Sequence, residues 1–114
     1  MKTSDIGKLD GVVCLQKDYV DAEVMDGYTS DLLSDVMAHA REGSVLITIQ
    51  AHKNTVAVCS LAGVVAILIC NNRPAAEDML EAAAKEGIAV FRTRANQFQT
   101  SALIAQHIHH CPGR

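Results

Sequence analysis

The stretch VLITIQAHKNTVAVCSL, residues 45–61, predicts a strand, a turn and a helix in succession. The strand Val45–Ile49 is apolar, the turn Gln50–Asn54 is polar, and an apolar helix takes up the remainder. In an open α/β sheet, ligands bind outside the carboxyl ends of the strands, where the first turn of the next helix has free N–H groups. The turn places His52 and Lys53 at such a position, which favours an anion.

The size and composition of the chain indicate one globular domain, residues 1–114, with 49% hydrophobic and 20% charged residues. The net charge of −3 disfavours a nucleic-acid partner held by bulk positive charge. The longest apolar run, Ser60–Cys70, contains Gly63 and is shorter than the roughly 18 residues of a membrane span. The start, MKTSDIGKLDG, lacks the apolar core of a signal peptide. We therefore expect a cytoplasmic protein without a membrane partner.

Three of the cysteines, Cys14, Cys59 and Cys70, lie inside apolar segments, and their spacing contains no C-x-x-C pair. A zinc or iron–sulfur site built from them is therefore disfavoured. We expect these thiols to be reduced and buried in the core.

Predicted strands and helices alternate along the chain. The strands are Gly11–Leu15, Glu23–Asp26, Val45–Ile49, Val65–Cys70 and Ile88–Phe91; the helices are Thr3–Leu9 (one turn), a helix from Asp31 to a stop at Gly43, Thr55–Leu61, a helix from near Pro74 to a stop at Gly87, and Gln97–His107. Short connections between alternating elements predict parallel pairing, and near-continuous apolar strands predict a sheet that is covered on both faces. The expected fold is three-layer α/β/α with a mainly parallel sheet.

For two of these helices, the sequence predicts which residues face the core, and for one of them also the N-cap. Ser30 is predicted to be the N-cap of the helix that begins at Asp31, an acid placed where the helix dipole favours it. Apolar side chains are expected to face the core from both helices: Leu32, Leu33, Val36, Met37 and Ala40 from the first, and Phe98, Ala102, Leu103 and Ala105 from the last.

Basic residues gather in three predicted strand-to-helix turns, none of which contains Asp or Glu. In a parallel sheet these turns reach the same edge, so a nucleotide, a phosphate or an acidic partner is favoured there. Solvated loop charges are the simpler explanation. The candidate anion-binding residues are His52, Lys53, Asn54, Thr55, Asn71, Asn72, Arg73, Arg92, Thr93 and Arg94.

The tail offers a second kind of site. His107, His109, His110 and Cys111 are ligands suited to zinc, nickel or iron. Adjacent ligands on a short tail rarely close a tetrahedral site, so a polar C-terminus without metal is the favoured interpretation. No resident cofactor is predicted.

Catalysis is not favoured by any motif. Gly7-Lys8 lacks the upstream glycine and the following Ser or Thr of a P-loop, so kinase activity is rejected. Ser30, Asp31 and His39 suggest a nucleophilic set, but nine residues separate Ser30 from His39 and do not stack them on a helix.

Four segments, GYTSDLLSDVMAHA (27–40), ITIQAHKNTVAV (47–58), LICNNRP (68–74) and AAAKEGIAVFRT (82–93), give the sequence a likeness to a known family. It resembles the DRTGG domain family, which includes the domain before the kinase core of HPr kinase/phosphorylase and short hydrogenase-associated proteins. The name-giving motif is absent: its turn aligns with Ala51–Thr55, and a later glycine pair aligns with Asn71 and Asn72.

This resemblance implies an α/β/α fold similar to the substrate-binding domain of Mur ligases, frequent dimerisation and a regulatory role. We therefore expect a non-enzymatic, homodimeric, ligand-sensing domain that acts beside a hydrogenase or redox complex. The alternatives are an interaction adaptor without a ligand and a small nucleotide-binding enzyme that uses His52 and Lys53.

Overall fold

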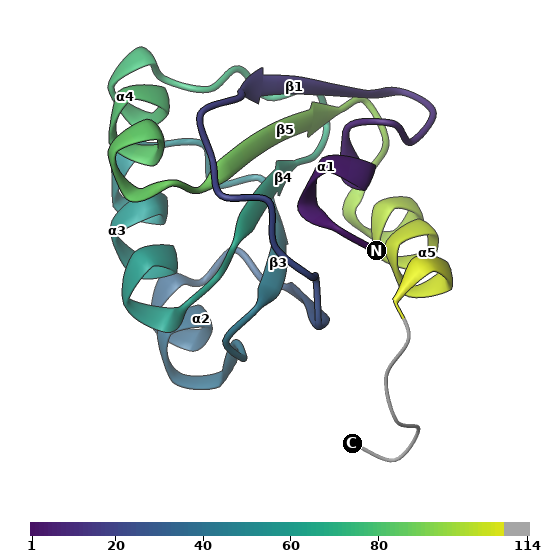
Figure 1. Ribbon diagram of the computed structural model, residues 1–114, viewed down its shortest axis with the longest axis horizontal. Coiled ribbons are helices and arrows are strands. Elements are labelled where there is room, and N and C mark those ends of the chain that lie inside the picture. The colour runs from purple at the N-terminus through teal and green to yellow at the C-terminus, as the bar shows by residue number, and fades with distance from the viewer. Residues whose placement is uncertain (109–114) are drawn as a thin grey trace.

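The structure is a computed structural model that describes residues 1–108. A five-stranded sheet lies at its centre, in the order β1-β5-β4-β3-β2 (Figure 1). The strands β2 to β5 are parallel, and β1 is antiparallel to β5. The elements are α1 Thr3–Ile6, β1 Val12–Gln16, β2 Asp26–Thr29, α2 Leu33–His39, β3 Ser44–Thr48, α3 Lys53–Ala62, β4 Ala66–Ile69, α4 Glu77–Glu86, β5 Ala89–Thr93 and α5 Gln97–His107. The predicted α/β fold with a mainly parallel sheet is confirmed.

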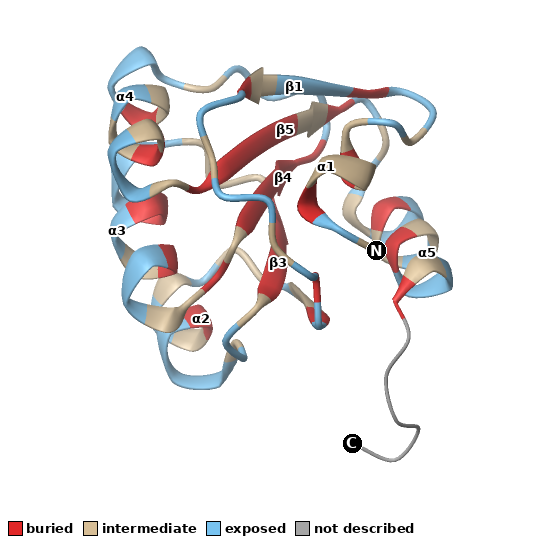
Figure 2. Cartoon of the chain, in the orientation of Figure 1, coloured by how far each residue is buried: buried red, intermediate tan, exposed pale blue. Residues whose placement is uncertain are grey.

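Helices cover both faces of the sheet. Figure 1 shows α2, α3 and α4 on one side and α1 and α5 on the other. Side chains alternate along β3 accordingly: Leu46 packs with Val36, Val56 and Met79 of the first group, whereas Ile47 packs with residues of α1 and α5. Both faces of β3 and β4 are buried, which explains why β4 is apolar throughout and β3 is apolar except at Ser44 and Thr48 (Figure 2).

The order of the connections determines where the chain changes face. The helices α2, α3 and α4 each lie between two neighbouring parallel strands and stay on one face. After β5 the chain crosses to the opposite face through α5, which packs there beside α1. The connections that leave the carboxyl ends of β4 and β5 therefore diverge to opposite faces, which is the geometry that opens a crevice in α/β sheets.

The strand β1 differs from the prediction in two ways: it is not parallel to its neighbour, and it is only partly buried. No helix separates β1 from β2, so no crossover forces β1 into the parallel set, and it pairs antiparallel at the outer edge of β5. Val13 is 52% exposed there, and Cys14 is exposed rather than buried as predicted. Cys59 and Cys70 are buried as expected, and burial raises the pKa of the Cys59 thiol to about 12.

The helix α2 begins later than predicted. Its N-cap is Leu32, without a side-chain cap, whereas the Ser30 hydroxyl accepts a hydrogen bond from the Leu32 N–H at 3.2 Å. The N-cap prediction for Ser30 is therefore wrong. Val36 is fully buried, but Leu32 and Met37 are 65% and 43% exposed, so only part of the predicted apolar face contacts the core. The helix α4 also starts later, at Glu77, and Pro74 lies in the preceding loop.

The helix α5 has the predicted bounds but turns a different side to the sheet. Thr100 and Ile104 are buried, one helical turn apart. Phe98 is two residues from Thr100, which places it on the opposite side of a helix with about 3.6 residues per turn. It is 83% exposed, so its predicted burial is wrong, and Ala102 and Ala105 are exposed as well. None of the helices in residues 1–108 is long and apolar enough to cross a membrane.

Gly63 ends α3 in a left-handed conformation (φ +77°), and a Cβ there would lie 3.3 Å from the Glu42 Cα and 2.8 Å from its Cγ. We expect Gly63→Ala to lower the free energy of unfolding by about 1–2 kcal/mol, because both strain and crowding oppose it. Gly11 (φ +80°) is the matched control, since a Cβ there meets nothing within 4 Å. Urea unfolding of both variants is the measurement, and a loss for Gly11→Ala as large as that for Gly63→Ala would contradict the crowding.

Candidate functional site

The loops after the four parallel strands lie along one edge of the sheet, here called the rim: residues 30–32, 49–52, 70–76 and 94–96. Because β1 runs in the opposite direction, its first residue, Val12, also lies at this edge, paired with Thr93. The rim therefore gathers the three predicted basic turns and adds residues from the α1–β1 connection.

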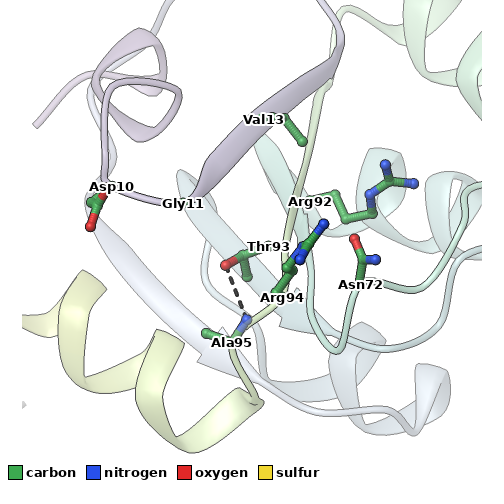
Figure 3. A pocket seen from close by; sticks show the side chains of 8 residues that line it. All are labelled: Asp10, Gly11, Val13, Asn72, Arg92, Thr93, Arg94 and Ala95. Atoms are coloured by element: carbon green, nitrogen blue, oxygen red, sulfur yellow. Dashed lines mark hydrogen bonds between the residues drawn. The ribbon is translucent and has the colours of Figure 1, made fainter.

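A pocket of about 390 Å³ opens at the rim beside β1 and β5 (Figure 3). We call it the rim pocket. Four of the ten predicted anion-binding residues, Asn72, Arg92, Thr93 and Arg94, line it. The other lining residues are Asp10, Gly11, Val13 and Ala95.

Arg92 is the central basic residue of the rim pocket. Its Cα is paired with Val13 on β1 and with Ile69 on β4. It follows Val90 by two residues, so its side chain leaves the sheet on the face that α2, α3 and α4 cover. Within residues 1–108, its Nε is buried and has no hydrogen-bond partner. Figure 3 shows Arg94 and Asn72 on the same side of the pocket as Arg92.

The loop after β4 is held against the loop after β5. Asn71 and Asn72 both adopt left-handed conformations, with φ of 59° and 52°, which asparagine and glycine tolerate best. Their backbone N–H groups donate to the Ala95 carbonyl at 2.9 Å and to the Thr93 carbonyl at 2.8 Å. These two bonds hold the backbone of Asn71 and Asn72 against the loop after β5, so that Asn72 lines the same pocket as the arginines.

Two of the candidate anion-binding residues have hydroxyls with hydrogen-bond partners inside the protein. The Thr93 hydroxyl accepts a hydrogen bond from the Ala95 N–H at 3.2 Å. The Thr55 hydroxyl is buried and donates to the Gln50 carbonyl at 2.9 Å. Both threonines therefore shape the turns in which they lie.

His52 and Lys53 do not line the rim pocket. His52 is exposed at the start of α3, with Nε2 at 3.0 Å from the Gln50 side-chain oxygen. Lys53 lines a separate groove between α3 and α4, together with Asp78 and Lys85. Asn54, Asn71 and Arg73 are exposed and do not line the rim pocket either. The predicted basic residues therefore lie in different places: Arg92 and Arg94 line the rim pocket, whereas Lys53 lines the groove between α3 and α4.

Asp31 is a rim residue that the sequence did not identify as part of the site. Its Oδ1 accepts hydrogen bonds from the Thr48 hydroxyl, the Ile49 N–H and the Gln97 Nε2, each at 2.9 Å. The Gln50 side-chain amide donates to the Asp31 backbone carbonyl at 3.0 Å. Asp31 therefore joins the loops after β2 and β3 to the first turn of α5, and adds a carboxylate to a rim that seemed purely basic.

A second polar cluster lies on β2 and α2. The Tyr28 hydroxyl donates to Asp35 Oδ2 at 2.8 Å, and His39 Nδ1 lies 3.0 Å from Asp35 Oδ1. Hydrogen bonds from Ser30, Tyr28 and His39 hold the pKa of the Asp35 carboxyl below its ordinary value. The Ser30 hydroxyl bonds to the Leu32 backbone and to Asp35, whereas His39 bonds to Asp35, so within residues 1–108 this cluster shows no nucleophile–base pair of the kind used in covalent catalysis.

Of the proposed metal ligands, the structure describes only His107, whose Nδ1 lies 2.9 Å from the Leu103 carbonyl oxygen. His109, His110 and Cys111 lie outside the described residues. Within residues 1–108, no group of three or more His, Cys, Asp or Glu side chains is arranged to hold a metal ion.

Comparison with known proteins identifies the family. The model of the DRTGG domain matches residues 9–107, nearly the whole chain. The chain belongs to the DRTGG domain family. This confirms the resemblance that the four sequence segments indicated.

A solved structure shares the fold of this DRTGG domain: the CBS and DRTGG domains of the regulatory region of Clostridium perfringens pyrophosphatase, complexed with its activator, diadenosine tetraphosphate. The TM-score is 0.70 at 15% sequence identity, over 93% of this chain and 46% of the other. This chain therefore spans about half of that structure. A search of curated proteins found no match.

Proposed function

We propose that this DRTGG domain is a non-catalytic regulatory domain that senses an anionic small molecule, a nucleotide or another phosphate compound, in the rim pocket. The observation that carries the proposal is the buried Arg92 Nε, which has no partner among the described residues and lies beside Arg94. A buried donor without an acceptor is unfavourable, and an anion in the pocket would supply the acceptor.

The chemistry of the pocket suits a phosphate group. Guanidinium groups present several N–H donors in a fixed plane and bind phosphate oxygens in pairs. The Asn72 side chain adds amide donors on the same side (Figure 3). The pocket forms where the connections after β4 and β5 diverge, and the Asn71 and Asn72 backbone bonds hold these connections in place. Little rearrangement is therefore needed when a ligand binds.

The regulatory part of the proposal is supported by the fold relative. In that protein the CBS and DRTGG domains form a regulatory region, and its structure contains a nucleotide activator. The non-catalytic part is supported by the absence of a P-loop from the sequence. We extend the proposal to a homodimer in the cytoplasm that acts beside a hydrogenase or redox complex, as the family resemblance implies. Exposed Leu61 on α3 and Met37 on α2 offer apolar surface for contacts between copies.

We expect pyrophosphate to bind the parent protein, and Arg92→Gln and Arg94→Gln each to weaken that binding by about tenfold. Each change removes a charge-assisted contact to an anion, and the lost free energy corresponds to at least this factor. Isothermal titration calorimetry at low salt is the measurement, because screening weakens the interaction at high salt.

Arg41→Gln is the matched control. Arg41 is exposed and precedes β3, at the amino ends of the strands and away from the rim, and its replacement changes the net charge equally. The proposal requires Arg41→Gln to bind pyrophosphate like the parent. If all three variants bind equally, or if the parent binds no phosphate compound, the rim pocket is not an anion sensor and the adaptor alternative is favoured.

A further inference from the structure

The rim pocket has an acidic side as well as a basic one. Asp10 lines it from the α1–β1 connection, and Figure 3 shows this residue on one side of the chain that runs through Thr93, with Arg92 and Arg94 on the other. No hydrogen bond or ion pair joins Asp10 to another of the described residues, so its carboxylate is not neutralised by either arginine. A simple anion gains nothing from this carboxylate and is repelled by it.

Next to Asp10, the pocket is lined by a residue without a side chain, Gly11. Gly11 follows Asp10 with a φ of +80°, and a Cβ built there meets no atom within 4 Å. A ligand therefore has access to the backbone at this point, next to the half-exposed Val13. The pocket volume of about 390 Å³ falls in the range of small-molecule sites, and a phosphate ion alone would leave much of it unfilled.

We propose that the rim pocket selects phosphate monoesters that carry a vicinal diol, as a nucleoside 5′-monophosphate does. The phosphate lies against Arg92 and Arg94, and the two hydroxyls donate to the Asp10 carboxylate across the backbone of Gly11. A carboxylate has acceptor sites for both hydroxyls and offers no donor to the phosphate. This inference rests on the proposed anion site and specifies which anions occupy it.

The test compares three probes: AMP, its 2′,3′-dideoxy analogue and inorganic pyrophosphate. With the parent protein, AMP is expected to bind about tenfold more tightly than the dideoxy analogue, since each hydroxyl bond to a charged acceptor contributes to affinity. Asp10→Asn is expected to weaken AMP binding by about tenfold and to remove the preference over the dideoxy analogue. Pyrophosphate is expected to bind this variant as tightly as the parent or more tightly, because a repelling charge has been removed.

Asp18→Asn is the matched control, because Asp18 is exposed beyond the far end of β1 and its replacement changes the net charge equally. It should leave all three affinities unchanged. The diol contact is refuted if Asp10→Asn binds both AMP and pyrophosphate more tightly than the parent does. It is also refuted if the parent binds AMP and the dideoxy analogue with equal affinity. In either case the proposed anion site is still supported if Arg92→Gln weakens the binding of all three probes. If Arg92→Gln has no effect on any probe, both proposals fail.

Discussion

Phe91→Ala is expected to lower the free energy of unfolding by about 3–5 kcal/mol, the usual loss when a buried Phe is truncated. The Phe91 side chain is 1% exposed and belongs to the core between the sheet and the helices α1 and α5. Its ring meets the Tyr19 ring edge-on, with 6.1 Å between centroids, and a Cβ at Gly7 would lie 3.1 Å from Phe91 Cε1. The truncation therefore leaves a cavity under α1 that the chain cannot easily fill.

The control for this prediction is the second phenylalanine of the chain. Phe98 is 83% exposed on α5, so Phe98→Ala is expected to change the free energy of unfolding by no more than about 0.5 kcal/mol. Urea unfolding of both variants, followed by circular dichroism, measures the difference. Equal losses for the two variants would mean that α5 turns a different side to the sheet than the structure shows.

Asp31→Ala is expected to lower the free energy of unfolding by about 2–3 kcal/mol. Its carboxylate oxygen accepts bonds from three donors, and one of them, the Thr48 hydroxyl, belongs to a fully buried residue. Without an acceptor, the Thr48 hydroxyl and the Ile49 N–H lose their partners, and Gln97 loses its link to the loop after β2. Urea unfolding is again the measurement.

Asp31→Asn separates the loss of the acceptor from the loss of charge. Its side-chain oxygen can still accept hydrogen bonds, although more weakly than a carboxylate does, so we expect a loss of about 1 kcal/mol. A full loss in Asp31→Asn would show that the charge matters more than the geometry. No loss in either variant would show that Asp31 does not hold the rim loops together.

Much of the fold was predictable because it is encoded locally. The runs Val45–Ile49 and Val65–Cys70 are apolar at every or nearly every position, which is the pattern of strands covered on both faces, and they correspond to β3 and β4. The bounds of α5 were also predictable, because Asn96 and Gln99 form a capping box at its start.

The side of each helix that faces the sheet was not predictable in the same way. A helix with several apolar residues, such as α5, offers more than one apolar face, and tertiary packing selects the one that contains Thr100 and Ile104 over the one that contains Phe98. The antiparallel β1 was missed for a related reason, because its pairing depends on the connection to β2 and not on its own sequence.

The site was only partly predictable, because its contacts are distant in sequence. Asp31 and Gln97 are 66 residues apart, so the pattern around Asp31 indicated only a helix start. Asp10 preceded a predicted strand and Gly11 began it, and neither carried a signal of its own, since antiparallel pairing is what brings them to the rim. The basic turns were recognisable from composition, but the structure places Lys53 in the groove between α3 and α4, apart from Arg92.

The central claim, an anion site in the rim pocket, is tested most directly by nuclear magnetic resonance of the ¹⁵N-labelled protein titrated with pyrophosphate. The account predicts that the largest saturable shifts of backbone amides occur at Gly11, Asn72, Arg94 and Ala95, which line the pocket. The amides of Lys53 and Lys85, in the groove between α3 and α4, are expected to stay unchanged. Saturable shifts centred on that groove, or no saturable shifts at the rim pocket, would contradict it.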